Sequence, residues 1–428
     1  MASVSLPSGM VARRVKRRRV PLAGAVLVVI TGMAFCLLWS PLVDHHSGWI
    51  VPGDIWGAYR SAHFIGWGDL GGIYAAGTAL ITFPAILLAL APVSIVTGFF
   101  GMSESIPFNL PHPSSWLVLG PVEILLSCSA LFACDALAER LGIGMARRTV
   151  LGLAEGVVVW DVSAYWGHPE DAVAVALALY AFLFAWDGRW CGAAWLFGLG
   201  VATQPVVLLM LPVYFVMADR RSLVPFMVRV LVPSVALLAV PLLAEFHTTV
   251  HSLVDQPNFP NIDHLTPWTR FAPRLGGSGK DMAVAAGPGR IVAISAAAAL
   301  GWTARRWRAR PDALVWVAAV ALALRCLTES VMVSFYVWPA LAVGLLAVMI
   351  QPSRLRVAGA VVVTVIVTFG SNSHLSEWPW WLLVNGGIVI LLVAGVPSRV
   401  PQFVPIDIGT GDVPEARAEL EALTGAPV

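Results

Sequence analysis

Residues 21–39 read PLAGAVLVVITGMAFCLLW, an uncharged stretch that closely follows the basic segment RRVKRRR of residues 13–19. A helix of about 20 mostly apolar residues is long enough to cross the hydrocarbon core of a bilayer. Similar apolar runs recur as far as Val396, in a chain of 428 residues that is 58% hydrophobic and only 12% charged. The sequence therefore predicts an all-α fold, a polytopic transmembrane helical bundle, because helices satisfy their own backbone hydrogen bonds in lipid.

Arginine clusters predict which loops lie in the cytoplasm, because short loops rich in Arg and Lys stay on that side. The clusters occupy residues 13–19, 147–148, 220–221, 305–310 and 354–356. They all fall on one side of the membrane only if the apolar stretch at residues 79–100 does not cross. We therefore expect a re-entrant or surface-lying element there, interrupted at Pro84 and Pro92.

The remaining apolar runs predict about twelve spanning helices, with both chain ends in the cytoplasm. Their approximate positions are residues 21–39, 115–137, 149–166, 170–187, 190–203, 205–218, 223–244, 287–303, 312–329, 331–350, 356–371 and 381–396. The predicted outer loops are residues 40–114, 164–170, 245–286 and 371–380. The chain then divides into a basic cytoplasmic amino terminus (1–20), a transmembrane domain (21–397) and a flexible cytoplasmic tail (398–428).

The first outer loop places a carboxylate and a cation just beyond the first spanning helix, in the segment GDIWGAYR of residues 53–60. Ionisable residues are costly at a membrane and commonly mark function. Asp54 beside an apolar wall is a candidate general base, and Arg60 could bind a phosphate. The alternative is a solvated loop in which Asp54 caps the short helix that contains Tyr59.

The short loop WGHPED of residues 166–171 forces its polar side chains toward the mouth of the bundle. Glu170 and Asp171 begin the next predicted helix, where negative charge interacts favourably with the helix dipole. That interaction is one explanation for the two acids. The other is that His168, Glu170 and Asp171 bind sugar hydroxyls or a divalent cation, of which the cation is the weaker alternative.

Two further polar positions interrupt the apolar runs. Gln204 precedes Pro205 at a break between two short helical runs, and its amide either bonds a neighbouring helix or faces a polar cavity. Arg325 lies inside a predicted helix end and needs a partner there. Glu329 at i+4 is the internal candidate, whereas Arg325 near Tyr336 could also neutralise a lipid phosphate.

Several chemistries lack their sequence signals. No GxxxxGK[ST] or GxGxxG motif occurs in a suitable context, so we expect no direct use of ATP or a nucleotide-sugar. His247 and His251 stand at i and i+4, but the intervening glutamate and a third ligand of a zinc site are missing. The five cysteines lie in or beside apolar runs. We therefore expect no cofactor, no metal, no disulfide framework and no nucleic-acid partner.

Taken in order, these residues resemble the polytopic glycosyltransferases of the GT-C type that use polyprenyl-phosphate sugars, and in particular the bacterial polyprenol-phosphate-mannose-dependent mannosyltransferases. The likeness covers roughly residues 20–350 and is diffuse. It rests on Gly53-Asp54, Tyr59-Arg60, Tyr74, Phe83-Pro84, the loop 166–171, and Gly198, Gly200, Gln204 and Pro212. Two positions depart from the family pattern: Ala85 replaces the second proline of an aromatic-Pro-Pro run, and no basic residue lies near Gln204.

The resemblance implies an enzyme that transfers a sugar, mannose by likeness, to an acceptor hydroxyl on the outer face of the cell membrane. Asp54 would be the catalytic base of an inverting displacement, and Arg60 and Arg325 would bind the donor phosphate. The residues expected to contact substrate are Tyr59, His168, Glu170, Asp171, Gln204 and Tyr336.

The implied partners are a polyprenyl-phosphate sugar donor, a glycolipid or glycan acceptor, and membrane lipids. Two alternatives remain open. One is a transporter or flippase for a lipid-linked saccharide, although transporters tend to place ionisable groups near the bilayer midplane. The other is a catalytically inactive relative of the GT-C enzymes.

Overall fold

The computed structural model of the protein describes residues 17–40, 42, 48–75, 80, 83–102, 112–254, 256–260, 263–275, 282–284 and 287–397. The predicted tail at residues 398–428 and most of the predicted basic terminus at residues 1–20 lie outside the described residues. All the described residues fall within one structural unit, which ends at Pro397.

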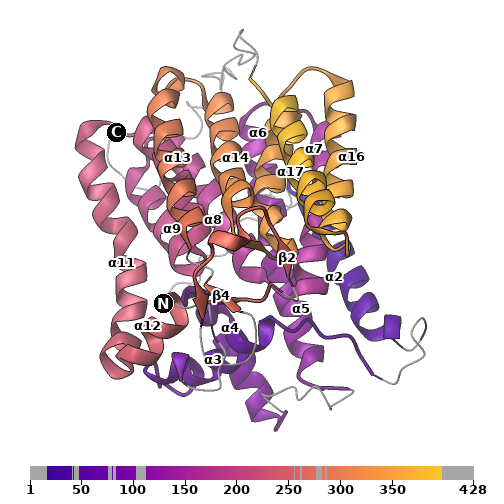
Figure 1. The fold of residues 1–428 in the computed structure, drawn as a ribbon, viewed down its shortest axis with the longest axis vertical. Helices are drawn as coiled ribbons and strands as arrows, with labels where there is room; N and C mark the ends of the chain where they lie inside the picture. The colour runs from indigo at the N-terminus through magenta and orange to yellow at the C-terminus, as the bar shows by residue number, and fades with distance from the viewer. Residues whose placement is uncertain are drawn as a thin grey trace, which may run out of the picture. The chain divides into compact units, whose positions relative to one another are not determined.

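Helices make up most of this unit, as the sequence predicts (Figure 1). Their bounds are α2 (Arg19–Trp39), α3 (Ile55–Gly66), α4 (Ala85–Phe99), α5 (Trp116–Ser127), α6 (Ser129–Arg140), α7 (Met145–Trp160), α8 (Pro169–Trp186), α9 (Trp190–Thr203), α10 (Leu211–Met217), α11 (Arg220–Ala244), α12 (Phe246–Val254), α13 (Pro288–Ala304), α14 (Pro311–Thr328), α15 (Trp338–Met349), α16 (Arg354–Ser371) and α17 (Glu377–Ala394). Short 3-10 or π segments extend or join them: η2 (Gly72–Tyr74), η3 (Asp161–Trp166), η4 (Pro205–Met210), η5 (Thr269–Phe271), η6 (Arg305–Trp307) and η7 (Ser334–Val337).

Among the described residues, seven helical segments are long and apolar enough to cross a membrane. They are Arg19–Trp39, Trp116–Arg140 (α5 with α6), Pro169–Trp186, Arg220–Ala244, Pro311–Thr328, Arg354–Ser371 and Glu377–Ala394. Some other predicted crossings fall on shorter apolar helices, such as α9 and the η7–α15 segment. A polytopic helical bundle is therefore supported, while the number of twelve crossings stays a prediction.

The predicted non-crossing stretch contains α4, a helix of 15 residues. The helix packs against α3, and both lie at the lower end of the bundle in Figure 1. It starts after Pro84, as predicted, but it continues through Pro92. The predicted interruption at Pro92 is wrong, because proline keeps a helical φ and one lost backbone hydrogen bond need not end a helix.

Short strands, which were not predicted, organise the described part of residues 245–286, the segment predicted as an outer loop. One antiparallel sheet has the order β1 (Pro257–Asn258), β4 (Met282–Val284) and β3 (Arg274–Leu275), and β2 (His264–Leu265) pairs with β5 (Val331–Met332). Just after β2, the Thr266 hydroxyl donates to the carbonyl of Glu329 at 2.9 Å. The loop is thereby fastened to the connection between α14 and α15.

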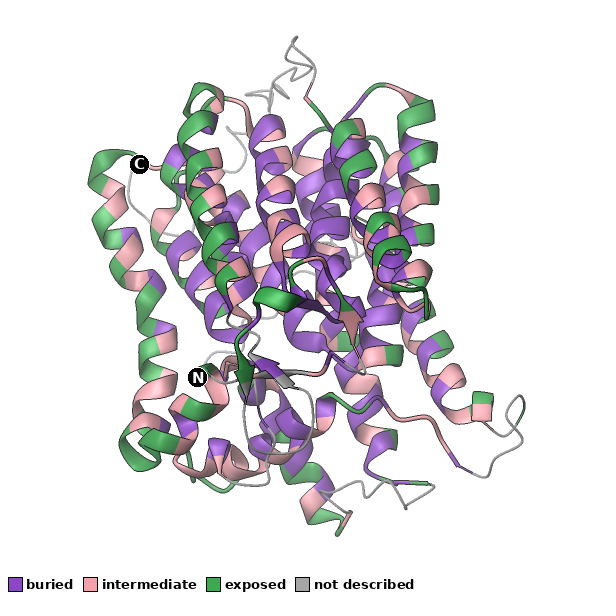
Figure 2. Cartoon of the chain, viewed as in Figure 1, coloured by how far each residue is buried: buried purple, intermediate pink, exposed green. Residues whose placement is uncertain are grey.

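Burial differs strongly among the helices (Figure 2). Every residue of α15 is buried. In contrast, α11 and α13 expose long apolar side chains such as Val224, Leu231 and Ile291. Apolar surface of this kind faces lipid tails in a membrane protein, so we interpret α15 as a central helix and α11 and α13 as peripheral ones.

Arginines tie together one end of the bundle. Arg148 in α7 donates from Nε to Asp135 Oδ1 at 2.7 Å, and Arg18, just before α2, donates from Nη1 to Asp135 Oδ2 at 2.7 Å. Arg147 donates to the carbonyl of Gln351 and, at 2.7 Å, to that of Pro352, both beyond α15. The start of α2, the end of α6, the start of α7 and the end of α15 therefore meet at one end, which we call the arginine end.

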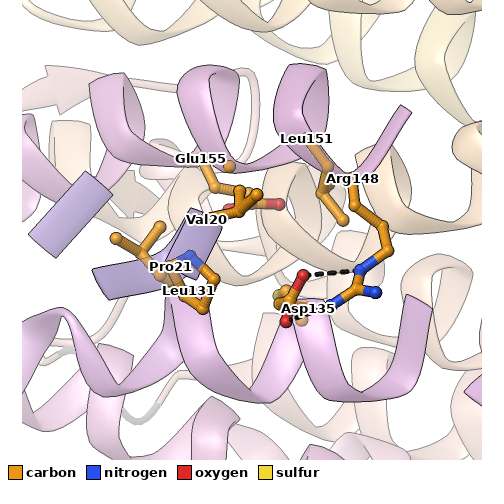
Figure 3. A pocket seen from close by; sticks show the side chains of 9 residues that line it. Val20, Pro21, Leu131, Asp135, Arg148, Leu151 and Glu155 are labelled. Atoms are coloured by element: carbon orange, nitrogen blue, oxygen red, sulfur yellow. Dashed lines mark hydrogen bonds and ion pairs between the residues drawn. The ribbon is translucent and has the colours of Figure 1, made fainter. Parts of the chain in front are cut away.

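A narrow hollow lies beside this network, among α2, α6 and α7 (Figure 3). Arg148 and Glu155 extend into it from the same helix, and Arg148 reaches Asp135. Glu155 is 1% exposed, and neither of its carboxylate oxygens has a hydrogen-bond partner in the described part of the chain. The hollow is too tight to admit a water molecule, so it is a packing defect around a buried carboxylate and has no room for a substrate.

Candidate functional site

At the end of the bundle opposite the arginine end, two predicted polar loops meet. Helix α7 begins near Arg148 and continues through the π turn η3 to Trp166, so the residues that follow lie at its far end. There Gly167 has a φ of 73°, a left-handed conformation that glycine adopts at no steric cost. A Cβ at Gly167 would lie 2.7 Å from the Cβ of Pro52. Glycine therefore lets the 166–171 loop approach the segment that carries Asp54.

His168 links Asp54 to two further carboxylates. Its Nε2 is hydrogen-bonded to Asp54 Oδ2 at 2.8 Å. Its Nδ1 lies 2.8 Å from Glu170 Oε1, which is close enough for a charge interaction but not aligned as a hydrogen bond. The same nitrogen lies 4.0 Å from Asp171 Oδ2. The imidazole also stacks on Phe335 with ring centroids 3.7 Å apart, so its orientation is fixed from several directions.

The charge of His168 follows from these contacts. Burial lowers the pKa of His168, but the charge of Glu170 and the hydrogen bond and charge of Asp54 raise it, and the net pKa lies well above its ordinary value. We therefore expect an imidazolium at neutral pH, with Nε2 donating to Asp54. The Asp54 side chain is held on this side and is still 47% exposed on the other. It is thus an oriented, accessible proton acceptor.

The capping role considered for Asp54 is not observed. Asp54 immediately precedes α3, but its side chain makes no capping hydrogen bond. Its hydrogen-bond partner is His168, in the turn between η3 and α8. For Glu170 and Asp171 the helix-dipole explanation still applies, because both lie in the first turn of α8.

Two buried carboxylates extend the site into the bundle. Asp171 is fully buried, and neither of its oxygens has a hydrogen-bond partner among the described residues. The same is true of Glu123 in α5, which was not predicted as a site residue. Glu123 interacts electrostatically with Glu170 and His168. The signal for it was present, because a lone acid within an apolar spanning run commonly marks a functional position.

Arg325 joins the same group from α14. Its Nε lies 3.2 Å from Glu329 Oε2, which confirms the predicted i+4 pair, and Arg290 approaches the same oxygen at 3.4 Å. The guanidinium carbon of Arg325 lies 3.6 Å from the centre of the Tyr336 ring, a cation–π contact. Arg325 also interacts electrostatically with Asp171.

Predicted clusters from three distant parts of the chain therefore come together. We call them the polar group, which consists of Asp54, Glu123, His168, Glu170, Asp171, Arg325, Glu329 and Tyr336. Close contacts join some members through His168 and others through Arg325, and the electrostatic interaction between Arg325 and Asp171 links the two parts. An isolated solvated loop would not have this arrangement, because several of these charged side chains are almost completely buried.

Three other predicted site residues have no hydrogen bond or ion pair with His168. Tyr59 is fully buried, and its hydroxyl lies 2.5 Å from Thr97 Oγ1, so it joins α3 to α4. Arg60 is partly exposed on α3. Gln204 follows α9 in an extended conformation just before Pro205, which confirms the predicted break there.

The strand-bearing loop between α12 and α13 adds a carboxyl near Asp54 that was not predicted. Asp263 directly precedes β2. Burial raises the pKa of Asp263 to about 6, the backbone N–H of Phe259 opposes this shift, and the charge of Asp54 adds to it. The neighbouring His264 stacks on Trp380 with ring centroids 4.0 Å apart. The loop is thus pinned at a position where its acid interacts with the predicted base.

The described residues contain no cluster of three or more His, Cys, Asp or Glu side chains arranged to hold a metal ion. No protein family matches the chain, and no curated protein matches its sequence. Function must therefore be inferred from the chemistry of the polar group itself.

Proposed function

We propose that the protein is an integral membrane glycosyltransferase that moves a sugar, mannose by resemblance, from a polyprenyl phosphate to an acceptor hydroxyl at the outer face of the membrane. The observation that carries this proposal is the hydrogen bond between His168 and Asp54, which holds an accessible carboxylate at one end of a membrane bundle. Arg325 belongs to the same polar group. A proton acceptor and a cation near a departing phosphate are what an inverting sugar transfer needs.

Asp54 is the base in this proposal. The acceptor oxygen attacks the anomeric carbon, its proton passes to Asp54, and the bond from the anomeric carbon to the phosphate oxygen breaks with inversion. His168 is a positioning residue, because it holds Oδ2 of Asp54 and leaves the other oxygen directed elsewhere. No covalent nucleophile is required, since one displacement completes the transfer.

The polyprenyl phosphate departs with both electrons of the broken bond, and a cation would stabilise the charge that develops. Arg325 is suited to this because its guanidinium is already held by Glu329 and Tyr336, so little reorganisation is needed. Arg60, on the helix that follows Asp54, is the second candidate. Guanidinium groups bind phosphate through paired hydrogen bonds, which supports a phosphate-bearing donor.

Sugar hydroxyls would meet the buried acids. Asp171 has two oxygens without partners among the described residues, and carboxylates accept hydrogen bonds from hydroxyl groups. Glu170 and His168 would line the same side, with Tyr336 and Gln204 as further contacts. Tyr59, buried between α3 and α4, is better placed to fix α3 than to touch a substrate.

A transporter or flippase for a lipid-linked saccharide is the second candidate. It is favoured by Glu123 and Asp171, two buried carboxylates in an apolar bundle whose oxygens have no hydrogen-bond partner among the described residues. Ionisable groups at such positions commonly mark ion or substrate paths in transporters. An inactive GT-C relative would share the polar group and would catalyse neither process.

One experiment separates these readings. Membrane vesicles with and without the protein are incubated with a panel of radiolabelled polyprenyl-phosphate sugars, and the products are separated from the donors. The proposal predicts that label leaves one donor and appears in a new glycolipid or glycan only when the protein is present. Protein-dependent movement of the unchanged labelled donor across the membrane would contradict the enzyme and favour the transporter. If the protein changes neither the chemistry nor the location of any donor, the inactive relative is favoured.

A further inference from the structure

Five arginines gather at one corner of the arginine end, where two helix connections lie side by side. Arg305, Arg306 and Arg308 belong to the turn between α13 and α14, and Arg220 and Arg221 begin α11. We call these five residues the arginine corner. Arg308 donates from Nη2 to the carbonyl of Ala218 at 3.1 Å, just before α11. This bond holds the two connections together.

Packing below the corner reinforces the same arrangement. Gly301 in α13 lies so close to α10 that a Cβ there would overlap Pro212. Asp219, next to the corner, interacts electrostatically with both Arg308 and Arg221. Its carboxylate is used to cap α11, because it accepts a hydrogen bond from the backbone N–H of Ser222 at 2.7 Å. The corner is therefore a cluster of cations held by packing and a hydrogen bond, with one aspartate beside it.

The positive charges of the corner are exposed and outnumber the single described carboxylate beside them, that of Asp219. All five arginines are exposed, and none has an ion pair with another described residue. Three other arginines at the same end do have such a partner: Arg18 and Arg148 pair with Asp135, and Arg310 pairs with Asp312 at 2.6 Å. With five cations and the single carboxylate of Asp219 beside them, the described part of the corner keeps a net positive charge.

The corner also borders the surface that faces lipid tails. On α13 the exposed apolar residues include Ile291, Ile294 and Trp302, and Trp302 is the last of them before the arginines. The guanidinium carbon of Arg305 lies 3.6 Å from the centre of the Trp302 ring. Tryptophan is enriched at the level of lipid headgroups, so this pair marks the boundary between hydrocarbon and water.

We propose that the arginine corner binds the headgroup of an anionic phospholipid, whose acyl chains lie along the exposed apolar faces of α11 and α13. The phosphate of the lipid would balance the positive charge that Asp219 alone does not. Guanidinium groups suit this role because their planar donors match phosphate oxygens. This site is independent of the polar group and of the proposed sugar transfer.

Native mass spectrometry of the detergent-purified protein tests the proposal by titration with phosphatidylglycerol and, separately, with phosphatidylcholine. The double variant Arg305→Gln/Arg306→Gln removes two corner charges, and Arg354→Gln/Arg356→Gln removes two exposed charges from the start of α16 as a matched control. One arginine near an anionic lipid contributes about fivefold in affinity, so we expect the corner variant to bind phosphatidylglycerol roughly 25-fold more weakly than wild type. The control variant should bind it as wild type does, and phosphatidylcholine should bind weakly to all three.

Equal weakening in both variants would overturn the proposal, because it would show non-specific attraction to the whole arginine end. Inorganic phosphate at the same concentration should not displace the lipid; full displacement would show a site for free anions instead. Should the double variant not be recovered, Arg306→Gln alone must weaken phosphatidylglycerol binding about fivefold, and unchanged binding would contradict the site.

Discussion

His168 Nε2 lies 2.8 Å from Asp54 Oδ2, although 114 residues separate the two in the chain. This contact connects the segment before α3 with the turn between α7 and α8. It holds Oδ2 of Asp54, whose side chain is still 47% exposed. The predictions below follow from this contact and from the buried charges around it.

The first prediction concerns pH. The pKa of His168 is raised in the folded protein, because Glu170 and Asp54 outweigh the effect of burial, so proton binding favours the folded state. This stabilisation is complete below the unfolded pKa of about 6.5 and is lost as the pH rises through the higher folded value. The Tm of wild type should therefore fall relative to that of His168→Gln as the pH increases from about 6.5. A Tm difference that is independent of pH, or that grows with pH, would contradict the imidazolium.

The second prediction compares two buried glutamates. The carboxylate of Glu155 has no hydrogen-bond partner within the described ranges, whereas Glu329 is 1% exposed and paired with Arg325 and Arg290. Glu155→Met should leave the free energy of unfolding unchanged or raise it by about 1–4 kcal/mol, because an unsatisfied carboxylate is removed. Glu329→Met should lower it by about 3–5 kcal/mol, since two arginines lose their partner. Thermal unfolding of both variants in the same detergent measures these changes. Equal changes in the free energy of unfolding would show that the ion-pair partners do not determine the effect of removing a buried glutamate.

The third prediction concerns sidedness. Single cysteines replace Ser376 and Ala146 in a background without the exposed native Cys191. Ser376 lies in the loop whose Asn372 accepts a hydrogen bond from Trp166 at 3.0 Å, so it marks the end that carries the polar group. Ala146 lies at the arginine end, beside Arg147. An impermeant thiol reagent added to intact cells should label the first position and not the second. The reverse pattern would invert the proposed topology.

The fourth prediction concerns the donor phosphate. Arg325→Lys keeps the positive charge but removes the planar guanidinium. That group stacks on the Tyr336 ring and, in the proposed function, would bind the donor phosphate. We expect KM for the polyprenyl-phosphate sugar to rise about tenfold, which corresponds to about 1.4 kcal/mol. The matched control is Arg189→Lys, because the guanidinium of Arg189 also lies over an aromatic ring, that of Phe184, elsewhere in the protein. An unchanged KM in Arg325→Lys would remove Arg325 from the donor site.

Much of the fold could be predicted from the sequence, because apolar length and arginine position act locally. The helices at Arg19–Trp39 and Trp190–Thr203 fall where their apolar runs predict them. The strands of the outer loop could not be predicted, since β2 is defined by its pairing with β5, far along the chain. Pro92 misled the prediction because a proline only sometimes ends a helix.

Most residues of the polar group could be predicted one by one, but their assembly into a group could not. Asp54, His168 and Arg325 were each identifiable as costly charges in an apolar chain. Their proximity was not, because it depends on how distant helices pack. Glu123 escaped prediction, although a single acid in an apolar run gave the same signal. Tyr59 was selected by its neighbours in the sequence, and the fold instead directs it between α3 and α4.

The most direct test of the central claim is sugar transfer by the Asp54→Asn variant in membranes supplied with the accepted polyprenyl-phosphate sugar. Asparagine keeps the shape of the side chain but cannot take up the proton of the acceptor. The account predicts at least a 100-fold loss of transfer with an unchanged amount of folded protein in the membrane. Transfer at the wild-type rate would show that Asp54 is not the base and would contradict the account.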